Sequence, residues 1–320
     1  MKNDTSIPKL ENVNCDLCES NSYTHLFEGM DYRFGRKEKY SVVKCKNCGL
    51  IYINPRPTAE SVLKLYEENY TPENNLKILP KIEKAKWKIV LKKIWHKING
   101  QYVDEIISKA EGKVLDIGCS NGYLLLSLKQ KGCEVYGVET NLKFVEICKE
   151  MGLEVFCGTV EDAKFPDESF DTIVMSQVLE HLPSPKTTLK EIFRVLKPKG
   201  KVLVYCPNPE SYLSQLFGKY WHGWHIPFHF YTFTKETIGK FAIKTGFKIK
   251  KISKITPDNF FVVSLKSYFW GDKNDCKQTL YKGKFFDSVV FRMCISFVIR
   301  LLDIFLEGDC LKVELIKESE

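Results

Sequence analysis

The sequence lacks any apolar run long enough to cross a membrane. Its longest uncharged apolar run near the C-terminus covers residues 293–299, only seven residues, whereas a membrane-spanning helix needs about 20. The first ten residues, MKNDTSIPKL, have no apolar core, so we expect no signal peptide and a cytoplasmic protein. Cysteine is also sparse, and 12 cysteines among 320 residues exclude a small protein held together by disulfides.

What is present is the composition of a globular protein. Apolar residues make up 44% and charged residues 28%, and we find no repeat or low-complexity tract. A length of 320 residues allows two domains, or one domain with an appendage. The net charge of +8 allows an anionic partner but selects neither nucleic acid, nor a membrane surface, nor a phosphorylated substrate.

Four of the cysteines stand in two C-x-x-C pairs, which are Cys15 with Cys18 and Cys45 with Cys48. Each pair puts two sulfurs on one side of a tight turn, and four thiolates suit tetrahedral Zn²⁺. We therefore predict a zinc ribbon whose closed four-thiolate site is structural. Two unrelated cysteine pairs, or a redox pair, are the alternatives. The other eight cysteines are scattered singly, as expected in a reducing compartment.

Residues 111–253 alternate short apolar β-runs with helix-length segments, which is the pattern of a parallel α/β sheet. Helix-length segments include 123–131 and 142–151. The expected strands cover residues 113–117, 134–138, 153–157, 171–175, 201–205 and 247–252. This alternation predicts a doubly wound, Rossmann-like sheet, in which ligands bind beyond the carboxyl ends of the strands.

The end of the first of these strands carries a glycine-rich loop, in the sequence VLDIGCSNGYLL. Gly118 and Gly122 let backbone amides approach a ligand and let the next helix pack closely. The spacing D-x-G-x-x-x-G, which begins at Asp116, differs from the G-x-G-x-x-G of dinucleotide binders. Glu139 ends the next strand, where a carboxylate can accept hydrogen bonds from both hydroxyls of a ribose.

A series of motifs in this order resembles the class I S-adenosylmethionine-dependent methyltransferases. The motifs are LDIGCSNG, FPDESFD, SQVLEHLPSP and RVLKPKGKVLV. The resemblance implies a seven-stranded sheet and S-adenosylmethionine as cofactor. The leading C-x-x-C pair, CGLIYINPRP, CPNP and PFHFYTFT further resemble a zinc-ribbon subgroup that modifies surface polysaccharides and sugars. The alternative is an α/β domain that binds another nucleotide or none.

The resemblance assigns eight residues to the cofactor site. It places the methionine part of S-adenosylmethionine on the glycine loop, the ribose of the cofactor at the end of the second strand, and its adenine after the third strand. The residues are Asp116, Gly118, Cys119, Gly122, Glu139, Glu161, Asp162 and Gln177. Two positions depart from the family pattern, because Ser120 replaces a loop glycine and Thr159 replaces an aspartate near adenine.

Histidines follow two of the expected strands. His181 comes after the fourth strand, and His225 and His229 lie in WHGWHIPFHF after the fifth. A methyl transfer from a sulfonium needs alignment and sometimes a base, and the unperturbed pKa of histidine, about 6.5, suits that role. We therefore select His181, His229 and His225 as catalytic candidates, although each could instead brace its loop. The aromatic neighbours could stack on a sugar ring.

The motifs also restrict the methyl acceptor. We find no oxygen-ligand cluster of the metal-dependent catechol type, no asparagine-proline-proline-aromatic motif and no cysteine-proline loop of a cytosine C5 enzyme. We therefore expect a small molecule or a saccharide, such as a lipid-linked or nucleotide-linked glycan, and regard nucleic acid as an unlikely partner. An RNA or protein methyltransferase, and a non-catalytic zinc-ribbon interaction module, are the alternatives.

Two segments have helical apolar stripes. Residues 81–98 carry seven lysines and one glutamate beside an apolar face, and residues 286–305 carry a broad apolar stripe. Each could pack on the sheet, or could lie peripherally on an anionic membrane at the inner face. The sequence leaves both alternatives open.

We divide the chain into four parts. These are a zinc ribbon (1–56), a helical connector (57–110), the cofactor-binding core (111–253) and a C-terminal part (254–320). The last part contains a helical insertion and ends in a probable antiparallel last strand at 308–317. The alternative last strand is 259–265.

Overall fold

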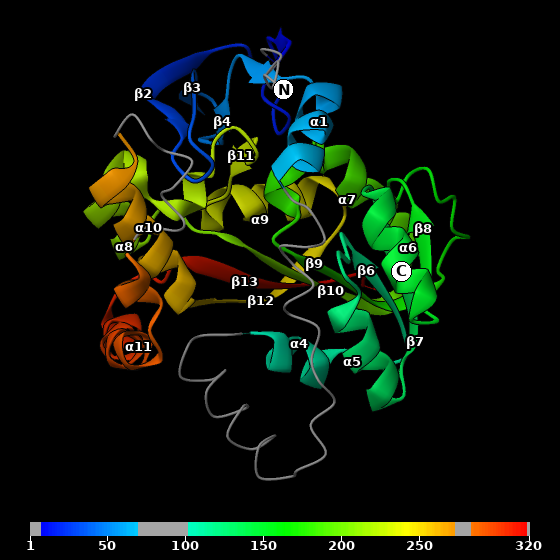
Figure 1. Cartoon of the computed structure of the whole chain (residues 1–320). Helices are drawn as coiled ribbons and strands as arrows, with labels where there is room; N and C mark the ends of the chain where they lie inside the picture. The colour runs from blue at the N-terminus through cyan, green and yellow to red at the C-terminus, as the bar shows by residue number, and fades with distance from the viewer. Residues whose placement is uncertain (1–7, 70–101, 273–282, 319–320) are drawn as a thin grey trace, which may run out of the picture.

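The computed structural model describes residues 8–69, 102–272 and 283–318. Its centre is a seven-stranded sheet flanked by helices (Figure 1). The strands of this sheet are β6 (Lys113–Ile117), β7 (Glu134–Glu139), β8 (Glu154–Cys157), β9 (Phe170–Ser176), β10 (Leu196–Pro207), β12 (Lys248–Ile255) and β13 (Cys310–Ile316). The six strands expected within residues 111–253 are all present, so the predicted Rossmann-like methyltransferase fold is confirmed.

The strand order is β12-β13-β10-β9-β6-β7-β8. β6 pairs in parallel with both β7 and β9. The chain therefore runs outward from β6 in one direction and then returns to β9 on its other side. This reversal is the switch point at which such sheets bind ligands, beyond the carboxyl ends of the strands.

Successive side chains of these strands point to opposite faces of the sheet, so each face has its own core. Helices α4 (Val103–Lys109), α5 (Tyr123–Lys131) and α6 (Leu142–Glu150) share one core with Val114, Val174 and Leu203. Helices α7 (Pro185–Val195) and α9 (Lys235–Lys244) share the other core with Leu115, Ile173 and Val204. Both faces are thus covered, as a parallel sheet requires.

The C-terminal part is helical before it returns to the sheet. Helices α10 (Asp258–Trp270) and α11 (Val289–Phe305) and the short helix η6 (Lys284–Asp287) precede β13. β13 lies antiparallel between β10 and β12, which confirms the predicted last strand. The alternative strand at 259–265 is wrong, because those residues lie inside α10.

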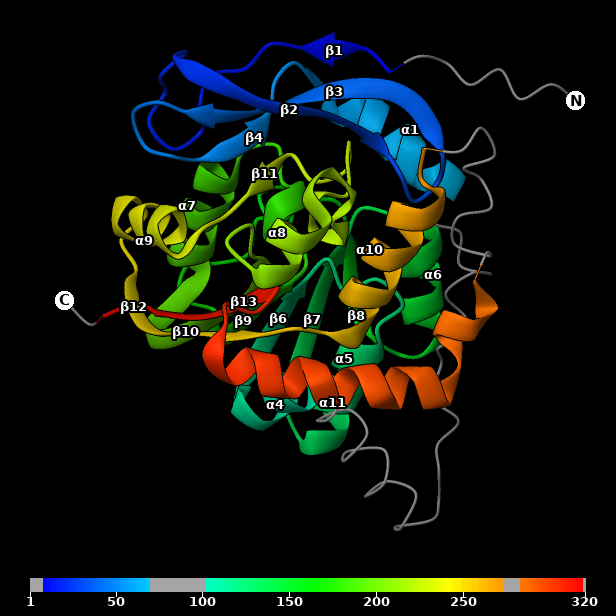
Figure 2. The same ribbon diagram turned by 90° about the vertical axis from the view of Figure 1, so that its left-hand side faces the viewer.

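The N-terminal region forms a second, four-stranded sheet of order β11-β4-β3-β2 (Figure 2). We call residues 8–57 the ribbon region. It contains β1 (Leu10–Glu11), β2 (Tyr23–Asp31), β3 (Arg36–Cys45), β4 (Ile51–Ile53) and β5 (Arg56–Pro57), and α1 (Ala59–Asn69) follows it. The fourth strand of this sheet, β11 (Tyr231–Thr232), comes from the loop before α9 and pairs with β4.

Side-chain bonds also fix the ribbon region to the loop after β9. Asp16 accepts hydrogen bonds from Ser184 Oγ at 2.7 Å and from the Lys186 amide at 2.8 Å. Arg56 donates to the carbonyl of Pro183 and to the hydroxyl of Tyr231, both at 2.9 Å. The ribbon region therefore lies over the edge of the sheet where β9 and β10 end.

Helix α11 has an unusual orientation, because its polar side faces the protein. Arg292 is paired with the fully buried Asp258, and Asp303 accepts hydrogen bonds from the amide and Oγ1 of Thr256, at 3.0 and 2.6 Å. The apolar stripe faces outward, with exposed fractions of 65% for Phe297 and 82% for Phe305. The stripe does not pack on the sheet. Of the two alternatives that the sequence left open for it, packing on the sheet is therefore wrong.

The described part of the chain contains no helix that is both long and apolar enough to cross a bilayer. The lysine-rich segment 81–98 lies outside the described residues. The three boundaries between the four predicted parts stay predictions.

Candidate active site

The glycine loop after β6 is shaped by positions that only glycine fits. Gly118 has a φ of +69°, and a Cβ on it would lie 2.7 Å from Cγ2 of Val178. Gly122, with a φ of +71°, would place its Cβ 2.8 Å from Sγ of Cys148. The left-handed backbone and the close neighbours together demand glycine at both positions. The loop can therefore stay tight at the sheet edge where the cofactor is expected.

Two carboxyl groups stand beside this loop. Glu139 accepts hydrogen bonds from the Ser120 amide and the Asn141 amide, both at 2.9 Å, so its carboxylate is fixed at the end of β7. Asp116 is buried at the end of β6. Burial, and then the negative charge of Glu139, raises the pKa of Asp116 to about 8. A positively charged group of a ligand would stabilise the ionised form of this carboxyl group.

Cys119 and Gln177 have their side chains in the protein. Cys119 packs with Leu125 and Cys148 in the core under the loop, so only its backbone faces the loop. Gln177 follows β9 with a φ of +57°, and its Nε2 donates to Sγ of Cys310 at 3.5 Å. Their predicted cofactor roles stay predictions.

The two acids after β8 have partners of their own. Glu161 accepts a hydrogen bond from Thr188 Oγ1 of α7 at 2.6 Å. Asp162 accepts one from Thr159 Oγ1 at 2.7 Å and thereby closes the turn after β8. Thr159 thus acts as a turn residue. The structure does not test the predicted contacts of these residues with adenine.

The three catalytic candidates come together after β9. His181 ends the short helix η2 (Leu179–His181), and His225 and His229 follow η4 (His222–Trp224). The ring centroids of His181 and His229 are 4.5 Å apart, and those of His225 and His229 are 5.0 Å apart. We call His181, His222, His225 and His229 the histidine cluster. One histidine from the loop after β9 and three from the segment after β10 therefore meet at the end of β9, next to the glycine loop.

The histidine cluster is held neutral by burial. Burial lowers the pKa of His181 to about 4, although the hydrogen bond with the Phe228 carbonyl acts in the opposite direction. Burial and the charge of Arg33 lower the pKa of His222 to about 3. The pKa values of His225 and His229 are also well below the usual range, first through burial. At neutral pH these rings are uncharged imidazoles with a lone pair to offer.

A pocket lies beside the cluster, between the β2–β3 turn and the loop that follows α8 (Tyr212–Phe217). Its wall is aromatic and basic, and it includes Tyr32, Arg33, Lys219, Tyr220, Trp224 and His225. The rings of Tyr32 and Tyr220 are 4.9 Å apart, and the Lys219 ammonium lies 4.8 Å from the Tyr220 centroid. Because His222 and His225 belong to both, the pocket adjoins the histidine cluster.

The sequence did not indicate the hairpin residues of this pocket. Asp31 is buried, and its Oδ1 accepts from the amides of Arg33 and Phe34, at 3.0 and 2.8 Å. Its Oδ2 is buried without a hydrogen-bond partner among the described residues. Only the fold places this turn of the ribbon region against the loop after β10, so no local motif could have revealed it.

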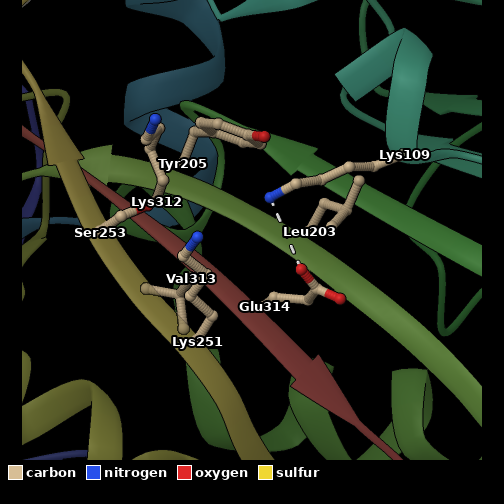
Figure 3. A pocket seen from close by; sticks show the side chains of 8 residues that line it. All are labelled: Lys109, Leu203, Tyr205, Lys251, Ser253, Lys312, Val313 and Glu314. Atoms are coloured by element: carbon tan, nitrogen blue, oxygen red, sulfur yellow. Dashed lines mark ion pairs between the residues drawn. The ribbon is translucent and has the colours of Figure 1, made fainter. Parts of the chain in front are cut away.

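A second pocket lies over the middle of β10, β12 and β13 (Figure 3). Lys109 crosses it to Glu314 at 3.5 Å, and Lys251 and Lys312 line it. It shares no residue with the glycine loop or the histidine cluster. We therefore do not assign it to the active site.

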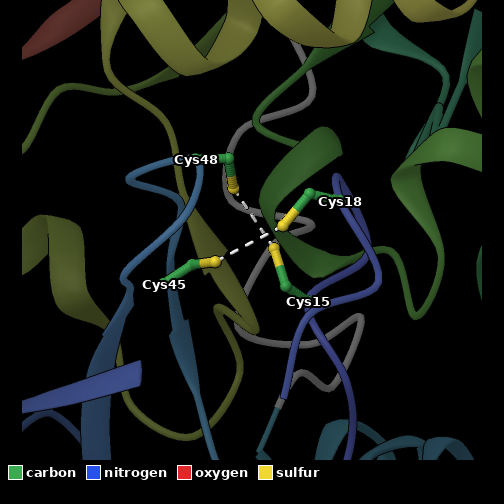
Figure 4. A group of neighbouring side chains, drawn as sticks. All are labelled: Cys15, Cys18, Cys45 and Cys48. Atoms are coloured by element: carbon green, nitrogen blue, oxygen red, sulfur yellow. Dashed lines mark hydrogen bonds between the residues drawn. The ribbon is translucent and has the colours of Figure 1, made fainter. Parts of the chain in front are cut away.

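The four cysteines of the two C-x-x-C pairs converge on one point (Figure 4). Sγ of Cys15 lies 3.4 Å from Sγ of Cys48, and Sγ of Cys18 lies 3.4 Å from Sγ of Cys45. Burial raises the pKa of Cys45, but the amides of Cys48 and Asn47 outweigh it and lower that pKa to about 7. The arrangement is consistent with a zinc ribbon.

Comparison with known proteins agrees with this geometry. Residues 94–252 match a family model described as a methyltransferase domain. A ubiquinone biosynthesis O-methyltransferase of Pseudomonas fluorescens is 27% identical over 168 residues, which are 48% of this chain and 72% of that protein. Its namesake from Saccharophagus degradans is 32% identical over 131 residues, which are 38% of this chain and 55% of that protein.

A solved structure supports the fold alone. The crystal structure of the cyclase SpnF matches with a TM-score of 0.53 at 17% identity, covering 83% of this chain and 98% of that one. The family model, the relatives and the glycine loop beside Asp116 and Glu139 all lead to one class of enzyme. The chain carries a class I S-adenosylmethionine-dependent methyltransferase domain.

Proposed function

We propose that this enzyme methylates a saccharide or another small hydroxylated molecule, carried on a nucleotide or on a lipid. The observation that supports the proposal is the aromatic and basic pocket that adjoins the histidine cluster. Aromatic rings such as Tyr32 and Trp224 can stack on a sugar ring, and Lys219 and Arg33 can neutralise a phosphate. The name O-methyltransferase of the relatives favours an oxygen acceptor.

The residues present fit S-adenosylmethionine, which supplies a methyl group on an electrophilic sulfonium. Asp116 would accept from its ammonium group, because a cation compensates this buried carboxyl. Glu139, fixed by two amides, would accept from the ribose hydroxyls. The histidine cluster would orient the acceptor and take up its proton, while the surrounding aromatic rings exclude water.

We further propose that Cys15, Cys18, Cys45 and Cys48 hold a structural Zn²⁺. Their sulfur atoms all lie within 4.8 Å of one another, close to the spacing that Zn–S bonds of about 2.3 Å impose. Four thiolates leave no open coordination position, so this centre would hold the ribbon region together and take no part in the chemistry. The turn that contributes Arg33 to the pocket would then depend on it.

The experiment that tests the enzymatic proposal measures formation of S-adenosylhomocysteine with separate acceptor pools. We expect turnover with nucleotide-sugar or lipid-linked glycan pools and none with RNA or protein. Turnover with RNA alone would contradict the proposal.

A matched pair of glycine variants controls this experiment. Gly118→Arg should abolish cofactor binding, because its side chain meets Val178. Gly132→Arg should retain binding, since Gly132 also has a positive φ but has nothing within 4 Å of an added Cβ.

We also propose that α11 rests on a membrane and presents the enzyme to a lipid-linked acceptor. Its exposed side carries Val290, Met293, Phe297, Leu301 and Phe305, while its arginines are turned inward. Soluble proteins rarely expose so continuous an apolar surface. The helix is joined to the acceptor side of the sheet, because Asn208 Nδ2, just after β10, donates to the Gly308 carbonyl at 2.8 Å.

Flotation with liposomes tests the membrane proposal. We expect the wild-type protein to float with vesicles that contain anionic lipids, and the double variant Phe297→Glu, Leu301→Glu to stay behind. Ile243→Glu is the matched control, because Ile243 is an equally exposed apolar residue on α9. If the wild type fails to float at low salt, or if the control loses flotation as well, the assignment to α11 is wrong.

A further inference from the structure

Three side chains of the active site lie as metal ligands do. One ligand atom each from Glu180, His181 and His229 falls within 4.8 Å of the others. Glu180 and His181 come from η2, and His229 comes from the loop before β11. Ligands bound to one metal ion at about 2.1 Å in tetrahedral geometry are separated by about 3.4 Å. Small rotations of these side chains would therefore close a metal site.

Both histidines are oriented by the backbone. Nδ1 of His181 lies 2.9 Å from the Phe228 carbonyl, and Nδ1 of His229 lies 2.7 Å from the Gly223 carbonyl. A carbonyl oxygen only accepts, so Nδ1 of each ring carries the hydrogen and Nε2 carries the lone pair. A hydrogen bond from the distal ring nitrogen to a backbone carbonyl is the usual support of a metal-ligating histidine.

Glu180 supplies an independent observation. Its side chain is completely buried, and neither carboxylate oxygen has a hydrogen-bond partner among the described residues. An unpaired buried carboxylate is costly, because it loses its water without compensation. A bound cation is the remaining way to keep this group ionised inside the protein.

We propose that Glu180, His181 and His229 bind a divalent transition-metal ion, separate from the cysteine centre. Two imidazoles and one carboxylate suit Zn²⁺, Fe²⁺, Mn²⁺ or Co²⁺, whereas Mg²⁺ and Ca²⁺ prefer oxygen ligands throughout. Three protein ligands leave at least one coordination position open, as in catalytic rather than structural centres. Metal binding itself does not depend on the proposed acceptor.

The open position would give the ion a role in the proposed function. A divalent ion bound to an acceptor hydroxyl lowers its pKa and thus prepares the oxygen for methylation. Arg33 lines the same pocket wall as His225 and brings a positive charge beside the histidine cluster. The same positive charge would favour an ionised oxygen at the open position.

Metal content distinguishes the two centres. The wild-type chain, purified without chelator and equilibrated with Zn²⁺, should retain two ions per chain by elemental analysis. His229→Ala and Glu180→Gln should each retain one. His222→Ala should retain two, because His222 belongs to the same loop but not to the ligand set. Cofactor affinity, measured by calorimetry, verifies that each variant is folded.

Cobalt substitution identifies the centre that is lost. His229→Ala should retain the intense sulfur-to-cobalt charge-transfer band of the cysteine centre and lose only the weaker ligand-field contribution of the histidine centre. One ion per wild-type chain, or two ions in both folded His229→Ala and Glu180→Gln, would overturn the proposal. Neither result depends on turnover, so failure of the proposed acceptor is a separate outcome.

Discussion

The cysteine cluster and the histidine cluster both join residues that are distant in the sequence, but in different ways. Each C-x-x-C pair brings two sulfurs together on one turn, so only two turns have to meet. His181 and His229 come singly from two loops, and the β11–β4 pairing of the ribbon region helps to hold the second loop in place. A cluster assembled from local pairs can be read from spacing, whereas one assembled from single residues requires the fold.

The two clusters also differ in what they leave open. Four thiolates would fill the coordination sphere of the proposed zinc ion, whereas Glu180, His181 and His229 would supply three ligands to the second proposed ion, beside a pocket. The comparison predicts that damage to the first cluster acts on folding and that damage to the second acts on chemistry.

The largest effect is expected from Cys18→Ser with Cys45→Ser, which removes one ligand from each turn. Zinc contributes on the order of 10 kcal/mol to folding in comparable small domains. The ribbon region should therefore become sensitive to proteolysis, and turnover should disappear because β11 loses β4. Cofactor affinity should stay within about threefold, since the glycine loop lies on the large sheet.

Cys157→Ser controls that experiment, because Cys157 is an exposed thiol outside the cluster. Limited proteolysis measures the stability of the ribbon region, and calorimetry measures cofactor binding by the large sheet. Complete loss of cofactor binding in the double variant would show that the two regions fold as one unit.

A smaller effect, confined to chemistry, is expected from His181→Ala. Turnover should fall about 100- to 1,000-fold, which is the range for loss of a group that assists removal of the acceptor proton, here by holding the proposed ion. Cofactor affinity and melting temperature should change little. His25→Ala, on an exposed histidine of β2, is the matched control. A variant with normal kcat would remove His181 from the chemistry.

The smallest effect concerns the pH dependence of cofactor binding. Because the pKa of Asp116 is raised to about 8, the group is largely protonated at pH 6 in the free enzyme. A cationic ligand needs the ionised form, so affinity should rise about tenfold between pH 6 and pH 7. Asp116→Asn should flatten this profile.

Calorimetry in two buffers of different ionisation enthalpy measures the proton released on binding. Release of close to one proton at pH 6.5 is the expected value for the wild type. If no proton is released, Asp116 does not pair with the cofactor.

The large sheet could be predicted from the sequence because its central strands are buried on both faces. Such strands appear as short apolar runs, and those at 113–117 and 134–138 match β6 and β7 to within one residue. The run at 259–265 has the same apolar character but continues as far as Trp270. Its length, rather than its composition, makes it the helix α10.

The direction of α11 could not be predicted. Periodicity shows that a helix has two sides but does not show which side faces the protein. Here the buried Asp258 binds Arg292 at 2.6 Å and thereby turns the polar side inward. Glu180 could not be selected from the sequence for a similar reason, since the lack of hydrogen-bond partners for its carboxylate among the described residues is visible only in three dimensions.

The position of β13 has a consequence for how the molecule is made. β13 separates β10 from β12, and each of its seven residues pairs with both neighbours. During translation, β10, β12 and the helices between β10 and β13 are therefore synthesised before β13, the strand that joins β10 to β12. Until residue 316 emerges, two strand edges are unsatisfied and open to wrong partners. Nascent chains that stall shortly before Cys310 should be the ones that chaperones hold longest.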